Sequence, residues 1–152
     1  MDKILVVDDE RSMRDFLSIM LKKAGYDVTT AVDGDEAVKI LHKDIFDLVI
    51  TDLKMPKVDG LQVLKTVKEL SPDTVVIVIT AFASTETTVE AMKEGAYDYI
   101  TKPFQNDEMK IRIKKALEKR RLSAENILLK KELKDRAVFD NIVGKSEKIE
   151  KV

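Results

Sequence analysis

Short hydrophobic runs, four of which end at a polar or reactive residue, constrain the fold of this chain more than any other sequence feature. Runs rich in β-branched residues and bounded by turn residues are typical of buried strands. The amphipathic stretches between them predict crossover helices, which require parallel strands. We therefore predict an α/β fold, a doubly wound parallel sheet of five strands at Lys3–Val7, Asp27–Ala31, Leu48–Thr51, Val75–Ile79 and Tyr97–Thr101.

The residues that follow these runs predict one shared site. Asp8 and Asp9 follow the first run, Asp52 follows the third, Thr80 the fourth and Lys102 the last. The carboxyl ends of parallel strands meet at one edge of a sheet, where open α/β sheets carry their sites. Three carboxylates, a hydroxyl and a lysine gathered there suit a divalent metal and a phosphoryl group.

Four motifs in this order and spacing resemble the receiver domain of two-component response regulators: VVDDE, TDLKMPKVDG, ITA and TKPF. The resemblance covers about residues 1–120, which are expected to form a receiver domain. It implies the flavodoxin-like strand order 2-1-3-4-5, which the sequence pattern alone does not determine.

The resemblance also implies a role for each site residue. Mg²⁺ (or Mn²⁺) would be held by Asp9, Asp52 and the backbone carbonyl of Lys54, with Asp8 assisting. Asp52 would be the phosphoacceptor, and Lys102 would supply a positive charge for the phosphoryl oxygens. The bond from Lys102 to Pro103 matches a peptide bond that is cis in the family and aims the lysine inward.

Two further residues match the family's switch. The Thr80 hydroxyl would move to bond the phosphoryl group, while the Tyr99 ring would turn inward and repack the surface near it. His42 is the only histidine, and it lies in a helical pattern away from the strand ends. The phosphodonor histidine is therefore expected on a partner, a sensor histidine kinase.

The C-terminal part predicts a helical linker and the start of another domain. The last helix is expected to continue into residues 121–137 as a coiled-coil linker. A heptad seam in this linker favours a homodimer and consists of Leu122, Asn126, Leu129 and Leu133. A single solvated helix is the alternative. Residues 138–152, including FDNIVGKSEKIEKV, resemble the opening of the AAA+ ATPase domain in sigma-54-dependent transcription activators of the nitrogen-regulation type. The chain is thus expected to regulate downstream AAA+ and DNA-binding domains that the sequence does not include.

Composition narrows the setting. The chain has no cysteine, so no disulfide is expected. It also lacks an apolar stretch long enough to span a membrane, and the cytoplasm is the predicted location. Residues 107–136 carry 11 Lys or Arg and 6 Asp or Glu. Because these charges surround an apolar seam, solvation or contact with a protein partner is favoured over direct contact with nucleic acid.

Three other functions are compatible with parts of the pattern. A stand-alone receiver would act through protein contacts alone. A flavodoxin-like cofactor protein would need a Ser-, Thr- or Gly-rich phosphate loop after the first strand, where this chain has Asp8 and Asp9. An aspartyl-phosphate hydrolase would need an acid two residues after Asp52, where this chain has Lys54. A regulatory module rather than an enzyme is therefore predicted.

Overall fold

The computed structural model describes residues 2–55, 58–82 and 85–122. By its internal contacts the chain divides after Arg120, and the first unit contains the whole sheet. Its elements are β1 (Lys3–Val7), α1 (Arg11–Lys23), β2 (Asp27–Ala31), α2 (Gly34–Lys43), β3 (Leu48–Asp52), α3 (Gly60–Leu70), β4 (Val75–Thr80), α4 (Glu86–Lys93), β5 (Asp98–Thr101) and a C-terminal helix described over residues 106–122.

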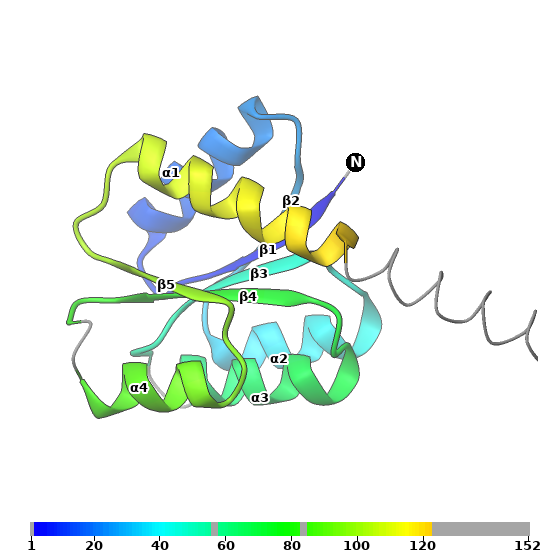
Figure 1. Cartoon of the computed structure of the whole chain (residues 1–152), viewed down its shortest axis with the longest axis vertical. Coiled ribbons are helices and arrows are strands. Elements are labelled where there is room, and N and C mark those ends of the chain that lie inside the picture. The colour runs from blue at the N-terminus through cyan, green and yellow to red at the C-terminus, as the bar shows by residue number, and fades with distance from the viewer. Residues whose placement is uncertain (1, 56–57, 83–84, 123–152) are drawn as a thin grey trace, which may run out of the picture. The chain divides into compact units, whose positions relative to one another are not determined.

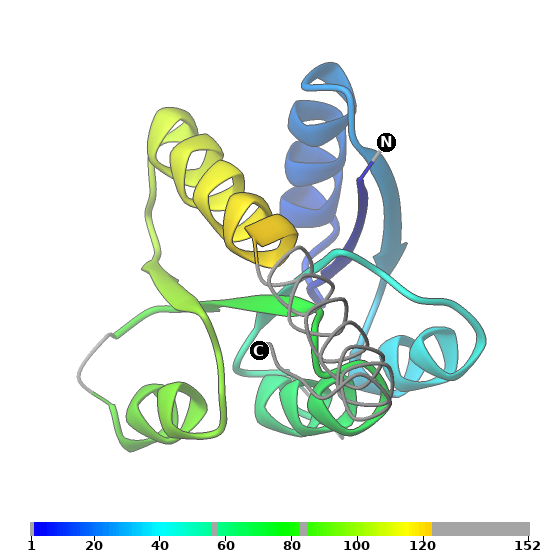
Figure 2. The same cartoon turned by 45° about the vertical axis from the view of Figure 1, so that its right-hand side comes forward.

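The five strands form one parallel sheet in the order β2-β1-β3-β4-β5. The α/β prediction and the strand order implied by the family resemblance are both confirmed. Figures 1 and 2 show that α1 and the C-terminal helix cover one face of the sheet, while α2, α3 and α4 cover the other.

The alternation of side chains along each strand produces two cores, one on each face. Ile4 and Val6 of β1 pack in a cluster with residues of α1 and of the C-terminal helix. Leu5 and Val7 of the same strand pack in a second cluster with residues of α2, α3 and α4. Since both faces of each central strand are buried, these strands are continuous apolar runs rather than alternating patterns.

Side-chain caps determine where three of the helices begin. The carboxylate of Asp33 accepts a hydrogen bond from the Glu36 N–H at the start of α2, and Asp59 accepts one from Gln62 at the start of α3. At α4 the hydroxyl of Thr85 accepts from the Thr88 N–H at 3.2 Å. Each cap satisfies a backbone donor that has no partner within its helix.

Strand pairing extends further at the carboxyl edge than the apolar runs predict. Asp52 pairs with Ile79, and Thr80 pairs with Thr101, so Asp52 and Thr80 are the last residues of their strands rather than the first loop residues. At the other edge, β5 begins at Asp98, one residue later than predicted.

Much of the predicted linker lies outside the described residues. Leu122 is the last residue described and is 64% exposed. The predictions for Asn126, Leu129, Leu133 and residues 138–152 fall beyond it. Within the described ranges, no helix has the length and apolar character needed to cross a membrane.

Candidate functional site

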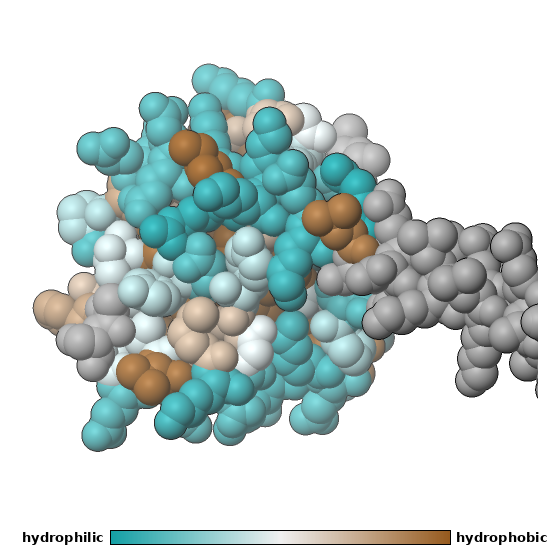
Figure 3. Space-filling view, in the orientation of Figure 1, coloured by the Kyte–Doolittle hydropathy of each residue, from teal (hydrophilic) through white to brown (hydrophobic). Residues whose placement is uncertain are grey.

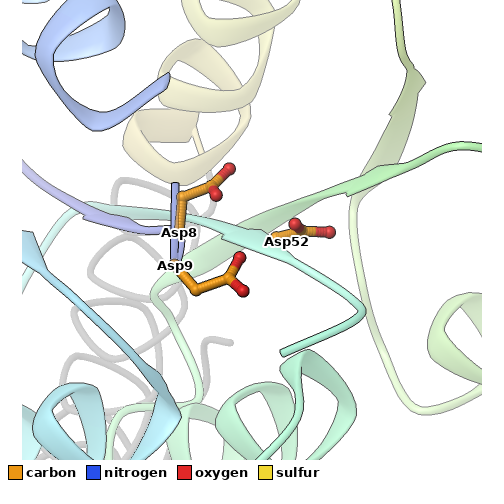
Figure 4. A group of neighbouring side chains, drawn as sticks. All are labelled: Asp8, Asp9 and Asp52. Carbon is orange, nitrogen blue, oxygen red and sulfur yellow. The ribbon is translucent and has the colours of Figure 1, made fainter. Parts of the chain in front are cut away.

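The carboxyl ends of β1 and β3 bring together the three aspartates that the sequence singled out. The two strands are direct neighbours, with Val7 paired to Thr51, so the residues that follow emerge side by side. Carboxylate oxygens of Asp8, Asp9 and Asp52 all lie within 4.8 Å of one another. Figure 4 shows the three side chains extending from the strand ends into the same region.

A glycine allows α3 to begin directly against the end of β3. The Gly60 N–H donates to the carbonyl oxygen of Leu53 at 3.0 Å. A Cβ atom at residue 60 would lie 2.2 Å from the Asp52 carbonyl oxygen and 2.7 Å from the Leu53 Cα, closer than real Cβ contacts. Only glycine allows α3 to begin this close to the backbone of Asp52 and Leu53.

Lys102 follows the end of β5, and its side chain reaches the carboxylates across the end of β4, which lies between β5 and β3. Its Nζ lies 3.2 Å from Asp52 Oδ2, 3.6 Å from Glu10 Oε1 and 3.8 Å from Asp8 Oδ2. The peptide bond from Lys102 to Pro103 is cis. Burial alone would lower the pKa of Lys102, but the charges of Asp52, Asp8 and Glu10 raise it above the ordinary value, so the ammonium stays charged.

Asp8 is the most buried of the three aspartates, with 0% of its surface exposed. Its Oδ1 accepts a hydrogen bond from the Glu10 N–H at 2.9 Å, but its Oδ2 has no hydrogen-bond partner within the described residues. Burial raises the pKa of Asp8 to about 6, although the Glu10 N–H and the charge of Lys102 oppose this. This carboxyl is therefore costly to ionise where it lies.

The charge balance of the cluster favours a divalent cation. Three carboxyl groups, from Asp8, Glu10 and Asp52, lie within 3.8 Å of the Lys102 ammonium. The carboxyl group of Asp9 adjoins those of Asp8 and Asp52, so four acidic groups share one cationic side chain. Oxygen ligands in an open cluster are what Mg²⁺ prefers, and a buried carboxylate oxygen without a donor is satisfied when a cation binds it. The residues present therefore fit the metal that the family resemblance implies.

Thr80 and Tyr99 lie on the neighbouring strands β4 and β5, and the contacts described for them are with α4 and the loop before it rather than with the aspartates. Thr80 is 6% exposed, and the hydrogen bonds described for its hydroxyl go to Phe82 and Thr88 rather than to the carboxylates. Tyr99 of β5 is half-buried and lines a cavity beside α4 with Thr88. Thr88 is therefore common to the surroundings of both residues.

Three residues in the site or next to it were not assigned a role from the sequence. Glu10 pairs with Lys102, Gly60 admits the start of α3, and Thr88 bonds the Thr80 hydroxyl. Only Glu10 had a local signal, because it directly follows the two aspartates. Lys54, whose carbonyl was predicted as a metal ligand, donates its N–H to Asp52 Oδ1 at 3.3 Å, and the role of its carbonyl stays a prediction.

The family model for the response regulator receiver domain matches residues 4–114. This chain belongs to the receiver domain family. The match runs from Ile4 in β1 to residue 114, about halfway along the described C-terminal helix, and so includes every strand end that contributes to the site. The predicted receiver domain of a two-component response regulator is confirmed.

Curated relatives of this receiver domain are much longer proteins. It is 42% identical over 114 residues to the transcriptional regulatory protein ZraR of Escherichia coli (strain K12), covering 75% of this chain and 26% of that protein. It is 39% identical over 145 residues to a putative NtrX-like response regulator of Rickettsia bellii (strain RML369-C), covering 94% of this chain and 30% of that protein. The chain thus spans less than a third of these relatives.

Solved structures with the same fold include both long and short proteins. NtrX from Brucella abortus is 36% identical, with a TM-score of 0.80 over 86% of this chain and 30% of that one. The response regulator TrrA from Thermotoga maritima, crystallised with Mg(2+)-BeF, is 36% identical with a TM-score of 0.68 over 76% of this chain and 99% of that one. At this identity the resemblance extends beyond the fold to the family.

Proposed function

We propose that this receiver domain accepts a phosphoryl group on Asp52 from a sensor histidine kinase. The observation that carries the proposal is the position of Lys102 Nζ, 3.2 Å from Asp52 Oδ2 and beside the cluster of aspartates. Asp8, Asp9, Asp52 and the Lys54 carbonyl would hold Mg²⁺ (or Mn²⁺). When bound, the metal supplies positive charge that neutralises the carboxylates and the phosphoryl oxygens.

The chemistry asked of the protein is modest. A carboxylate oxygen of Asp52 attacks phosphorus and forms an acyl phosphate, while the bond from phosphorus to the donor's imidazole nitrogen breaks and the imidazole leaves with its electron pair. Lys102 remains charged and pairs with a phosphoryl oxygen. Phosphoryl transfer depends mainly on such positioning and charge neutralisation.

Phosphorylation would then be transmitted through Thr80 and Tyr99. The Thr80 hydroxyl has its described hydrogen bonds within the loop and α4, so bonding to a phosphoryl oxygen requires it to exchange partners. Tyr99 is half-buried beside α4 and has room to change its position relative to the cavity there. Exchange at these residues would alter the surface formed by α4 and β5.

We further propose that the domain regulates a sigma-54-dependent transcription activator. The likeness to long regulators such as ZraR and NtrX supports this over a stand-alone receiver. Residues 121–137 would act as a coiled-coil linker that joins two copies, and residues 138–152 would begin an AAA+ domain. In this proposal a homodimer passes the relative orientation of its two receivers to downstream AAA+ and DNA-binding domains.

The test is acetyl phosphate with Mg²⁺, followed by intact mass measurement. The unchanged chain should gain one phosphoryl group, since the acyl phosphate forms as acetate leaves. Asp52→Ala should gain none, whereas Asp35→Ala, which removes an exposed carboxylate on α2, should gain one as before. Equal phosphorylation of Asp52→Ala would show that another residue is the acceptor.

A further inference from the structure

Three threonine hydroxyls converge on one backbone carbonyl between β4 and α4. Hydroxyl oxygens of Thr80, Thr85 and Thr88 lie 3.1, 3.2 and 3.1 Å from the Phe82 carbonyl oxygen. A carbonyl oxygen has two lone pairs, so it cannot accept fully from all three at once. One hydroxyl is therefore always available to bond elsewhere, and the cluster can re-form when one member leaves.

The hydrogen-bonding capacity of the Thr80 hydroxyl is already filled within this cluster. It donates to the Phe82 carbonyl, and it accepts from the Phe82 N–H at 3.3 Å and from the Thr88 hydroxyl at 3.1 Å. A hydroxyl has one proton and two lone pairs. If it is to donate to a phosphoryl oxygen on Asp52, its bond to the Phe82 carbonyl must break.

Thr88 belongs both to this cluster and to the lining of a cavity between α4 and β5. The residue is 1% exposed, and its hydroxyl also lies 2.8 Å from that of Thr85. It lines an open cavity of about 440 Å³ between α4 and β5, together with Val89, Met92, Lys93 and Tyr99. Val89 and Met92 are 47% and 37% exposed. Figure 3 shows other exposed apolar residues as small groups among hydrophilic ones on the face of the molecule drawn there.

We propose that Thr88 is a positioning residue that couples the Thr80 hydroxyl to α4 and to the cavity beside Tyr99. The inference rests on the proposed function, because Thr80 must respond to a phosphoryl group. When the Thr80 hydroxyl turns to donate to a phosphoryl oxygen, the Thr88 hydroxyl donates instead to the vacant position on the Phe82 carbonyl. The hydrogen bond between the Thr80 and Thr88 hydroxyls is then lost. That bond joins the end of β4 to the first turn of α4.

The side-chain chemistry at residue 88 provides a matched set of variants. Thr88→Val keeps the shape of the side chain and removes the hydroxyl, whereas Thr88→Ser keeps the hydroxyl and removes a methyl group. Thr87→Val makes the same chemical change at the neighbouring, half-buried position of the same helix. The cap from Thr85 to the Thr88 N–H does not depend on the side chain at 88, so α4 keeps its start in all three.

The experiment records backbone amide NMR signals with and without beryllofluoride, a phosphoryl mimic, in the presence of Mg²⁺. In the unchanged chain and in Thr87→Val, signals at the strand ends and over residues 86–93 should both shift. In Thr88→Val the α4 shifts should fall below about half of the unchanged values, while beryllofluoride binds with an affinity within about twofold. Thr88→Ser should restore the α4 shifts, a result that a general loss of packing does not predict.

Each outcome decides the inference. If Thr88→Val transmits the full shift to α4, Thr88 is not the coupling residue, although Asp52 and Thr80 keep their proposed roles. If Thr88→Val no longer binds beryllofluoride, residue 88 acts on the acceptor site itself and the coupling role is wrong. If the unchanged chain shows no response to beryllofluoride, the proposed function fails together with the inference.

Discussion

Replacing Asp8 by asparagine is expected to stabilise the metal-free domain at neutral pH. Asp8 is fully buried, and its Oδ2 has no hydrogen-bond partner within the described residues. Burial raises the pKa of this carboxyl from 3.8 to about 6, so keeping it ionised at pH 8 opposes folding. Asparagine has nearly the same shape, can still accept from the Glu10 N–H, and carries no charge.

The size of the effect follows from the pKa shift, which runs from 3.8 to about 6. At the usual conversion between pKa and free energy, this shift sets an upper limit of about 3 kcal/mol. The cluster opens to solvent at Asp9, which screens the charges, and the variant loses the attraction of Lys102 for Asp8. We expect a net gain of about 1 to 2 kcal/mol in the free energy of unfolding once that screening is included.

The pH dependence gives the sign a second check. Because the folded state binds this proton more tightly than the unfolded state, the Asp8 contribution is favourable at low pH. Stability from this group then falls as pH rises from about 4 to about 6, and it stays low above that. The advantage of Asp8→Asn should therefore be absent near pH 4 and complete by about pH 7.

Urea unfolding at pH 4.5 and pH 8, with EDTA and then with saturating Mg²⁺, measures this directly. Mg²⁺ should stabilise the unchanged domain and reduce or reverse the advantage of the variant, since the ion binds an ionised carboxylate more tightly than an amide. Asp15→Asn, which removes a carboxylate that is 63% exposed, is the control. It should change stability by less than about 0.5 kcal/mol. An Asp8→Asn domain that is no more stable than the unchanged one at pH 8 in EDTA would refute the reasoning.

Three other predictions concern a cap, a close contact and the lifetime of the acyl phosphate. Asp33→Ala removes the cap of α2 and should lower the free energy of unfolding by about 1 kcal/mol in urea titrations. Beryllofluoride binding should be unchanged, and weaker binding would contradict a purely local role. Gly60→Ala brings a Cβ against the Asp52 carbonyl, so it should destabilise the domain by about 2 kcal/mol or more. It should also weaken Mg²⁺ binding in calorimetry, and unchanged behaviour in both assays would contradict the contact. Phe82 lies two residues after Thr80, the residue proposed to bond the phosphoryl group, and is 67% exposed. Because its ring cannot accept a proton, Phe82→Glu should shorten the lifetime of the phosphorylated form several-fold by mass measurement. An unchanged lifetime would show that water is not activated from this position.

Most of the fold was predictable because its strands are buried on both faces. Runs such as Leu48–Thr51 and Val75–Ile79 contain no charged residue, and the chain becomes polar only where the strand reaches the edge of the sheet. The predicted ends were one residue short at β3 and β4, because backbone pairing includes Asp52 and Thr80. Composition marks where burial changes, whereas the hydrogen bonds of the ladder determine where a strand ends.

The location of Asp8, Asp9, Asp52 and Lys102 at one edge also follows from the sequence once the strands are parallel. Their separation in the chain does not matter, because each lies at the carboxyl end of a strand or within two residues after it. The pairing of Glu10 with Lys102 was not predictable, because the two residues are far apart in sequence. The direction in which the chain enters α1 places Glu10 beside the lysine, and no local pattern gives that direction.

The sequence by itself determined which chemical groups lie at the edge of the sheet, because local hydrophobic patterns indicate the strands and the helices between them indicate that the strands are parallel. Only the tertiary structure decided the state of those groups. The pKa of Asp8 depends on how many atoms from other segments exclude water from it, and the Thr80 hydroxyl bonds Thr88 because α4 packs beside β4. Desolvation and hydrogen-bond direction arise from contacts between distant segments, and no local pattern of residues records them.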